Sequence, residues 1–313
     1  MKSHFLQSKE WEAFQKAEGF EIFREKGKNF EFMAILKPTS LGNYLFLPYG
    51  PTLKDKSALK SAATAIKKLA REKNCIFARI EPTSPFSAAE MKKIGAKKST
   101  HFDPEHTWAM DLAQNEDEIF ASIGKNKSRA YKNRATKGIS VRTSKNPADM
   151  NIFFKFYESV AEKDNFQTNE RKYLENQLKF DFTTLYIAEF ADENGKKIPI
   201  AATIMYTGKD ACYYAYAGAD YEFRKKEAGA ILLIQMIFDA KAAGKKIFDF
   251  WGITTSEDPK DPWYGFSKFK KSFGGYQIDY AGTYDLPINR VKYLAYSLLR
   301  PINKFKRKIF KKN

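Results

Sequence analysis

The stretch from Gly229 to Phe250, GAILLIQMIFDAKAAGKKIFDF, joins a long apolar segment to a short one. Residues 229–243 are apolar on nearly all sides of a helix of about four turns, which is typical of a helix buried in a core. After Gly244, residues 246–250 form a short apolar run with strand propensity. A buried helix that leads into a strand is typical of α/β units, so this stretch predicts a mixed α/β fold.

Three strands and a basic turn are predicted just before this helix. The strands are expected at residues 185–190, 200–206 and 211–216, separated by turns that contain Asp, Asn and Gly. The turn from Arg224 to Gly229 then leads into the helix. Such a turn can hold an anion, as it holds the coenzyme A pyrophosphate in GNAT acetyltransferases. Its single glycine favours an ordinary loop before a core helix.

The first third of the chain repeats this order of elements. An amphipathic helix with an N-cap serine is predicted from Ser8 to Lys16, and another from Ser57 to Glu72. Short apolar runs predict strands at residues 30–36, 44–47 and 75–80. In the second part of the chain, helices are expected at 116–123 and 147–161, before the three strands named above. Because one mixed plan occurs twice without a sequence repeat, we expect two related α/β domains.

Length and composition agree with two folded domains. The chain has 313 residues, of which 43% are hydrophobic and 15% aromatic, so it can form two cores and a disordered class is excluded. We expect residues 1–105 and 279–313 to form the first domain, and residues 106–278 to form the second.

The charge balance indicates an anionic partner. Lys and Arg number 54 against 37 Asp and Glu, and the net charge of +17 suits a nucleic acid, a phosphate-bearing metabolite or a lipid surface. Cys75 and Cys212 are too few for a disulfide framework, and the three histidines lack the spacing of a metal site. There is no signal-peptide pattern and no apolar run long enough to span a membrane. We therefore expect a cytoplasmic protein that is at most peripheral at the inner face of the cell membrane.

Residues 124–145 form a one-sided basic segment, with eight basic residues and no acidic one. On a helix, one face would hold Lys125, Arg129 and Lys132, and another would hold Tyr131 with Ala135. Like charges this close repel each other by a few tenths of a kcal/mol per pair. The segment therefore favours phosphate contact over a merely solvated helix face.

Two further segments are candidates for ligand contact. From Arg290 to Asn313, basic residues alternate with apolar ones, so this tail can lie on anionic lipid headgroups, track RNA phosphate or simply solubilise a docked helix. Residues 248–275 interleave aromatic side chains with lysines and end in Gly274 and Gly275. Aromatic rings supply stacking surfaces, lysines bind phosphate or carboxylate, and glycines let a backbone approach a ligand closely.

Several motifs follow one another along nearly the whole chain. They are Tyr49-Gly50-Pro51, Arg79-Ile80-Glu81-Pro82, Lys127–Ala135 followed by Gly138-Ile139, Tyr214–Ala219, Phe248–Ile253, Phe269–Gly275 and Tyr280–Asp285. In this order they resemble the Fem family of aminoacyl-tRNA-dependent transferases, which build peptidoglycan cross-bridges. The resemblance implies an α/β (mixed α+β) fold of two GNAT-like domains in tandem with a groove between them. Because residues 118–147 leave no room for a coiled-coil arm, the chain is similar to the compact, FemX-like members.

The resemblance also implies a reaction and the residues that perform it. An amino acid would pass from aminoacyl-tRNA to the stem-peptide amine of a peptidoglycan precursor, either lipid II or UDP-MurNAc-pentapeptide, without a cofactor and in a monomer. Lys270 matches a lysine near the reacting groups, and Glu81 matches an acidic position in the groove. Substrate contacts are implied for Phe269, Tyr214, Tyr216, Tyr49, Arg79 and Trp251, and tRNA contacts for Lys125, Lys127, Arg129, Lys132 and Arg134.

Two phosphate-binding positions of the family match this chain less closely. The family's lysine falls at Lys16 or beside it at Gln15, and its arginine aligns with Asn169, close to Arg171. This weaker match slightly favours a lipid-linked precursor. An acyl-coenzyme A-dependent N-acyltransferase and a non-enzymatic RNA- or membrane-binding protein are the alternatives.

Overall fold

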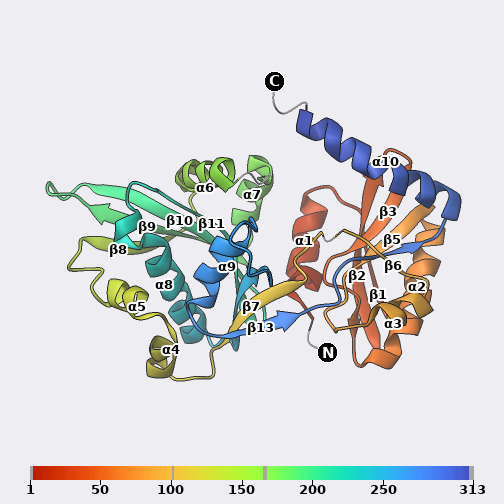
Figure 1. Ribbon diagram of the computed structural model, residues 1–313, viewed down its shortest axis with the longest axis horizontal. Helices are drawn as coiled ribbons and strands as arrows, with labels where there is room; N and C mark the ends of the chain where they lie inside the picture. Colours follow the sequence, from red (N-terminus) through yellow and green to blue (C-terminus); the bar gives the residue numbers. More distant parts are fainter. Residues whose placement is uncertain (1–2, 101, 165–167, 310–313) are drawn as a thin grey trace. The chain divides into compact units, whose positions relative to one another are not determined.

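The computed structural model describes residues 3–100, 102–164 and 168–309, which fall into two compact units (Figure 1). Unit 1 comprises Met1–Glu105 and Asp279–Asn313, and unit 2 comprises His106–Ile278. Each unit has a mixed β-sheet with helices packed against it and a hydrophobic core of its own. The expected mixed α+β class is therefore confirmed.

The sheet of unit 1 has the strand order β1-β2-β3-β5-β14-β6, and β4 pairs with β2. The strands are β1 (Ile22–Lys26), β2 (Phe30–Thr39), β3 (Gly42–Leu47), β4 (Thr52–Leu53), β5 (Cys75–Ile80), β6 (Lys97–Lys98) and β14 (Tyr284–Pro287). Neighbours are antiparallel except β3 and β5, which are parallel. The helix α2 (Leu59–Glu72) lies between these two strands in the chain, because parallel neighbours need a crossover connection.

The helices of unit 1 follow the apolar pattern of the sequence. The helix α2 buries one face, formed by Leu59, Ala62, Ala63, Ile66 and Leu69, in the core. The helix α1 (Lys9–Ala17) begins after Ser8, whose hydroxyl accepts a hydrogen bond from the Trp11 amide at 3.1 Å, so the expected N-cap is confirmed. The other helical elements are η1 (Phe5–Gln7), η2 (Lys56–Ala58), α3 (Ala88–Lys93) and α10 (Arg290–Ile309).

The sheet of unit 2 has the strand order β13-β7-β12-β11-β10-β9-β8. The strands are β7 (His106–Asp111), β8 (Ile139–Ser144), β9 (Thr183–Ala191), β10 (Lys197–Thr207), β11 (Ala211–Ala219), β12 (Ile247–Gly252) and β13 (Tyr276–Asp279). Strands β11 and β12 are parallel. The pairs β7–β12, β8–β9, β9–β10 and β10–β11 are antiparallel. The helix α8 (Ala228–Ala242) connects the parallel pair, as α2 does in unit 1.

The apolar helix predicted before residue 244 is confirmed as α8. It packs against β9, β10 and β11 on one side and against α5 (Lys125–Lys132) on another, which explains why its apolar residues surround the helix. In Figure 1, α6 (Met150–Asp164) lies on the other face of this sheet from α8. The remaining helical elements of unit 2 are α4 (Glu116–Ser122), η3 (Pro147–Asp149), α7 (Arg171–Leu178), η4 (Arg224–Lys226) and α9 (Tyr264–Lys271).

The helix in the basic segment is shorter than a shared face of Tyr131 and Ala135 requires. The helix α5 ends at Lys132, so Ala135 lies outside it and shares no helix face with Tyr131. The chain then turns at Gly138, whose φ of +69° is a left-handed conformation that glycine adopts without strain. The last part of the basic segment forms the strand β8, which pairs with β9. Sheet pairing with a distant strand therefore overrides the local helical pattern.

Candidate active site

Lys270 is the buried lysine of unit 2, and it lies in the last turn of α9. Its side chain is only 8% exposed, and its Nζ donates a hydrogen bond to the Gly252 carbonyl at 2.7 Å. The ring centroids of Phe266 and Tyr214 lie 5.1 and 5.9 Å from the Nζ atom. The amine thus lies at the end of β12, where Gly252 is the last residue, and aromatic rings surround it.

The electrostatics around Lys270 make its charge sensitive to pH near neutrality. Burial lowers the pKa of Lys270 to about 7, although the nearby Asp249 opposes this shift. Burial also raises the pKa of Asp249 to about 6, against the effect of its hydrogen bonds and of Lys270. The amine can therefore stabilise an anion when protonated and accept a proton when neutral.

Asp249 is a site residue that the sequence reasoning missed. Its Oδ1 accepts hydrogen bonds from the Thr107 hydroxyl and from the Trp251 amide, the latter at 2.7 Å. The one available signal was an aspartate within an otherwise apolar strand, Phe-Asp-Phe. Buried carboxylates in such positions need partners, and here Thr107 comes from the distant strand β7 while Trp251 lies on β12 itself.

Trp251 marks an irregularity in β12 beside the lysine. Its φ is +65°, an unusual conformation for a bulky residue, and the pairing of β12 with β7 shifts register between Asp249 and Gly252. The indole lies edge-on to Tyr206 and Tyr213, with centroids 6.1 and 5.6 Å apart. Gly252, whose carbonyl accepts the hydrogen bond from Lys270, directly follows this distorted residue.

Glu81 is the buried acid of unit 1, directly after β5. Its side chain is 3% exposed, and its Oε1 accepts hydrogen bonds from the Thr283 hydroxyl at 2.6 Å and from the Asp103 amide at 3.2 Å. Its Oε2 is buried and accepts no hydrogen bond among the described residues. A carboxylate oxygen in this position is a candidate proton acceptor.

Asp103 is the second acid beside Glu81, and the sequence reasoning missed it as well. Burial raises the pKa of both carboxyls, and the Glu81 charge raises the pKa of Asp103 further. Two carboxyls that interact in this way favour holding one proton between them. Unit 1 therefore contains an acid pair where the sequence indicated a single carboxylate.

Comparison with known proteins places this chain in a family. Residues 1–103 and 179–301 match the FemAB family. The chain belongs to the FemAB family. It is 30% identical over 139 residues to the aminoacyltransferase FemA of Staphylococcus aureus, a stretch that covers 43% of this chain and 32% of that protein. The chain thus matches about a third of the length of this FemAB relative.

Solved structures support the tandem GNAT-like fold of this FemAB family member. A FemX crystal structure covers 93% of this chain, and the chain covers 94% of it, with a TM-score of 0.81 at 17% identity. The C-terminal domain of a putative lysylphosphatidylglycerol synthetase from Agrobacterium fabrum gives a TM-score of 0.60 at 13% identity and covers 94% of this chain and 92% of its own. A tandem GNAT protein from the clavulanic acid biosynthesis pathway gives 0.53 at 12% identity, over 86% and 83% of the two chains.

The predicted tRNA-binding residues of this FemAB chain lie on and just after α5. Lys125, Arg129 and Lys132 are exposed, as phosphate contacts require. Lys127 is half-buried, and its Nζ lies 5.6 Å from the ring centroid of Phe269. Arg134 stacks on Tyr131, with 3.9 Å from its guanidinium carbon to the ring centroid. Lys127 thus brings the basic helix next to α9, the helix that carries Lys270.

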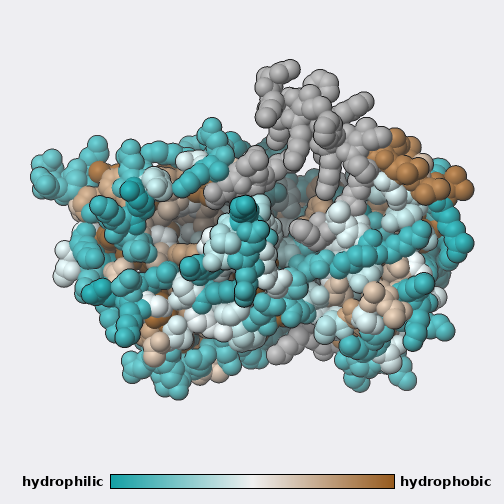
Figure 2. All heavy atoms as spheres, in the orientation of Figure 1, coloured by the Kyte–Doolittle hydropathy of each residue, from teal (hydrophilic) through white to brown (hydrophobic). Residues whose placement is uncertain are grey.

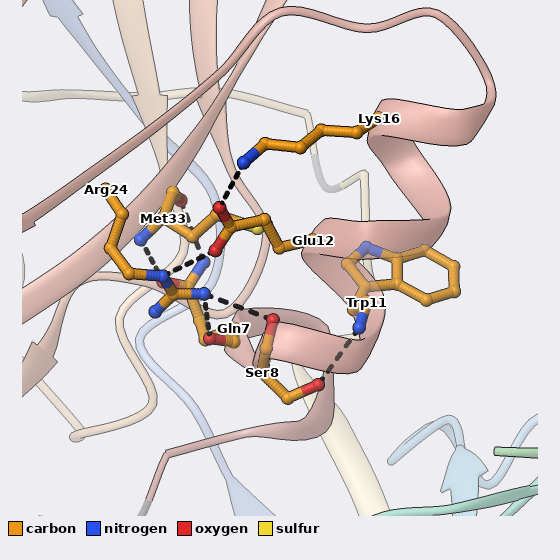
Figure 3. Close-up of polar contacts among 7 residues, drawn as sticks. All are labelled: Gln7, Ser8, Trp11, Glu12, Lys16, Arg24 and Met33. Carbon is orange, nitrogen blue, oxygen red and sulfur yellow. Dashed lines mark hydrogen bonds and ion pairs between the residues drawn. The ribbon is translucent and has the colours of Figure 1, made fainter. Parts of the chain in front are cut away.

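The two residues that compete for each uncertain position differ in their contacts. In unit 1, Gln15 is buried, whereas Lys16 is exposed and donates to the Glu12 carboxylate at 2.8 Å (Figure 3). In unit 2, the Asn169 amide donates to the Tyr216 hydroxyl at 3.1 Å. The phosphate-binding roles at both positions stay predictions.

Arg171 contacts two residues of α6. Its Nε donates to Glu158 at 2.9 Å, and its guanidinium carbon lies 4.3 Å from the ring centroid of Phe154. Tyr214 and Tyr216 are half-buried on β11, and only Tyr214 lies beside Lys270. The substrate-binding role of Tyr216 stays a prediction.

Two predicted substrate residues of unit 1 are already used by the fold. Arg79 is buried and donates two hydrogen bonds to Asp285, at 2.8 and 3.0 Å, so its guanidinium is paired within unit 1 and its substrate contact stays a prediction. Tyr49 is also buried, with its hydroxyl donating to the Pro104 carbonyl at 3.2 Å and its ring 3.8 Å from that of His4. Tyr49 is linked to Glu81 through the next residue in the chain, because the Glu81 amide donates a hydrogen bond to the Gly50 carbonyl at 2.9 Å.

The two glycines after α9 serve internal packing. A Cβ on Gly275 would lie 2.2 Å from the Ala109 carbonyl oxygen, and one on Gly274 would lie 2.6 Å from the Ser122 side chain. Both residues also have positive φ angles. The close approach that the sequence suggested for a ligand is used instead by the protein's own strand β7 and helix α4.

Proposed function

We propose that this FemAB family member is an aminoacyltransferase that acts on a peptidoglycan precursor. It would move an amino acid from aminoacyl-tRNA to the stem-peptide amine of lipid II or UDP-MurNAc-pentapeptide, and so contribute to the interpeptide bridge. The family match at both ends of the chain carries this proposal. The chemistry of the buried Lys270 and the exposed basic helix supports it.

The reaction forms one bond and breaks another at the same carbonyl carbon. The precursor amine attacks the ester carbonyl of the charged tRNA, and the new C–N bond replaces the bond to the tRNA ribose oxygen. The amine gives up a proton, and the departing ribose oxygen takes one up. Because the ester is already activated, holding the two reactants in position could supply about 7–11 kcal/mol of the barrier.

Lys270 would stabilise the negative charge that develops during this attack. A protonated amine near the ester oxygen or the terminal tRNA phosphate lowers the energy of the transition state. With a pKa of about 7, Lys270 can also return a proton to the ribose oxygen and be reprotonated from solvent. Phe266 and Tyr214 keep water from the amine and so strengthen its electrostatic effect.

Glu81 would receive the proton of the attacking amine or orient that amine. Its Oε2 is the buried oxygen that accepts no hydrogen bond among the described residues, and an ammonium group would supply one. Asp103 would position Glu81 through the proton that the pair shares. Proton transfer assisted by the substrate itself is the alternative route.

The basic helix α5 would contact the tRNA backbone. Lys125, Arg129 and Lys132 are exposed charges that neutralise phosphates, so binding would weaken as the salt concentration rises. Because charged tRNA is a cytoplasmic reactant, the reaction would take place on the cytoplasmic side. Among the described helices, none is long and apolar enough to cross a bilayer.

The decisive experiment is transfer of a labelled amino acid from tRNA to a lysine-containing muramyl pentapeptide, free and lipid-linked. We expect transfer by the full chain and a rate about 10²–10³-fold lower for Lys270→Ala. Lys268→Ala is the matched control, because Lys268 is an exposed lysine of the same helix. Normal transfer by Lys270→Ala would refute the role of this lysine.

The same preparation tests the two alternatives. Binding of coenzyme A in calorimetry, together with acetyl transfer, would favour an acyl-coenzyme A-dependent enzyme that uses the turn at residues 224–229. In the structure this turn contains the short helix η4 and Glu227 at a φ of +56°. Equal binding of charged and uncharged tRNA without any transfer would favour a non-enzymatic RNA-binding protein.

A further inference from the structure

The helix α10 packs on unit 1 through an aromatic face. The rings of Tyr293 and Tyr296 lie 5.4 and 4.8 Å from that of Phe77, a residue of β5. The Tyr293 hydroxyl donates to Asp285 at 3.2 Å. This face therefore anchors the first turns of the helix to the sheet of unit 1.

A second apolar face of α10 points away from unit 1. Val291, Leu294 and Leu298 are 80%, 61% and 66% exposed, and Leu299 is 40% exposed. Their spacing of three and four residues places the first three in one stripe along the helix. Figure 2 shows a patch of strongly hydrophobic residues over the first half of α10. Such a contiguous exposed patch indicates a binding surface.

The charge around this stripe selects the kind of partner. From Arg290 to the last residue, the chain has nine lysines and arginines and no aspartate or glutamate, which is more than half of the net charge of +17. RNA would use these positive charges but would leave the aliphatic side chains exposed. A second copy of this chain would bring two strongly positive segments together. An anionic lipid surface satisfies both the aliphatic stripe and the charge.

We propose that α10 is a membrane-docking helix, whose stripe of Val291, Leu294 and Leu298, with Leu299 beside it, inserts among the lipids of an anionic bilayer. The exposed Arg290 and Lys292 beside the stripe would lie at the level of the headgroup phosphates, and the basic residues that follow it in the sequence add to the positive charge. The tyrosine face holds the helix to unit 1, so docking brings the whole of unit 1 to the lipid surface. This proposal stands on α10 alone and does not depend on the transfer reaction.

The experiment is co-flotation of the full chain with vesicles of phosphatidylcholine alone and with vesicles that contain 30% phosphatidylglycerol. We expect binding to the anionic vesicles and little to the neutral ones. The triple variant Val291→Ser/Leu294→Ser/Leu298→Ser should bind the anionic vesicles at least about tenfold more weakly than the parent chain, because it loses apolar burial and keeps every charge. Tyr221→Ser is the matched control, since Tyr221 is 61% exposed in unit 2. This variant should bind the vesicles as the parent chain does.

A second measurement reports insertion directly. Leu298→Cys carries an environment-sensitive dye, while Cys75 and Cys212 are buried and react slowly. A blue shift of the dye with anionic vesicles, absent at Tyr221→Cys, supports insertion. Equal vesicle binding by the parent chain and the triple variant would overturn the proposal, because charge alone would then suffice. A dimer that the triple variant abolishes, or a loss of tRNA binding without vesicle binding, would overturn it in favour of another partner.

Discussion

Strands β5 of unit 1 and β12 of unit 2 have the same place in their sheets but handle buried charge in different ways. Each is the second strand of a parallel pair and follows a crossover helix, α2 or α8. On β5, Arg79 meets the carboxylate of Asp285 through two hydrogen bonds. At the end of β12, Lys270 donates to a backbone carbonyl, while the nearby Asp249 accepts from Thr107 and Trp251.

This difference separates a structural charge from a reactive one. The pKa of Arg79 is raised by Asp285 against the effect of burial, so the guanidinium stays charged at any working pH. The pKa of Lys270 is lowered by burial to about 7, because its acceptor is neutral and the attraction to Asp249 is not enough to compensate. The paired site stabilises the fold, whereas the unpaired amine can change its protonation during a reaction.

The largest effect is expected from breaking the pair on β5. Asp285→Asn should destabilise the protein by about 3–5 kcal/mol, because it leaves a buried guanidinium without its counter-charge. The matched variant Asp249→Asn should cost far less, since an amide oxygen can still accept from Thr107 and Trp251. Chemical denaturation of both variants measures the difference. Equal losses of unfolding free energy would show that the two strands do not differ in this way.

The next effect concerns the pH dependence of transfer. If Lys270 acts as a cation, kcat/KM should fall as pH rises through about 7, where the buried amine loses its proton. Asp249→Asn should shift this fall to lower pH, because the negative charge that raises the pKa of Lys270 is gone. The remaining kcat/KM of Lys270→Ala should not fall as pH rises through about 7. A pH profile unchanged in Asp249→Asn would contradict the coupling between the two residues.

A smaller effect is expected from the acid pair behind β5. The pKa of Asp103 is raised in the folded state, so the stability that its bound proton contributes is complete below its ordinary pKa and is lost as pH rises through the raised value. In Asp103→Asn, the free energy of unfolding should therefore fall less with rising pH than it does in the parent chain. Urea unfolding of the variant and the parent chain at several pH values tests this. Glu72→Gln, an exposed acid of α2, is the control and should leave the decline unchanged.

The smallest effect is expected on tRNA binding by α5. Lys125→Ala and Arg129→Ala should each weaken binding a few-fold and reduce the slope of log K against log salt by about one contact. Lys196→Ala and Lys209→Ala are controls, since both lysines are exposed on hairpin turns of unit 2. Identical slopes in all four variants would place the RNA contact elsewhere on the protein.

Most of the long elements were predictable because their signal is local. The helices α2 and α8 and the strands β9, β10 and β11 follow from apolar patterns within consecutive residues. The strands β8, β13 and β14 were not predicted, since they are short and partly polar and exist because a distant neighbour pairs with them.

The candidate site was predictable only where a motif named its residues. Lys270 and Glu81 were found through the resemblance to the Fem family, but nothing near them in the chain announced Asp249 or Asp103 as partners. The contact of the Asn169 amide with Tyr216 could not be predicted, because 47 residues separate them in the chain. Arg79 carried the same motif signal as Glu81, yet its geometry makes it structural.

The sequence by itself determined the family, the positive charge and the order of the main helices and strands, since these depend on composition and on neighbours along the chain. Only the tertiary structure decided which charged side chains are paired and which are buried alone. Arg79 meets Asp285 from 206 positions away, and Lys270 is enclosed by β11 and β12. The desolvation that sets the pKa of a side chain comes from segments that are adjacent only after folding.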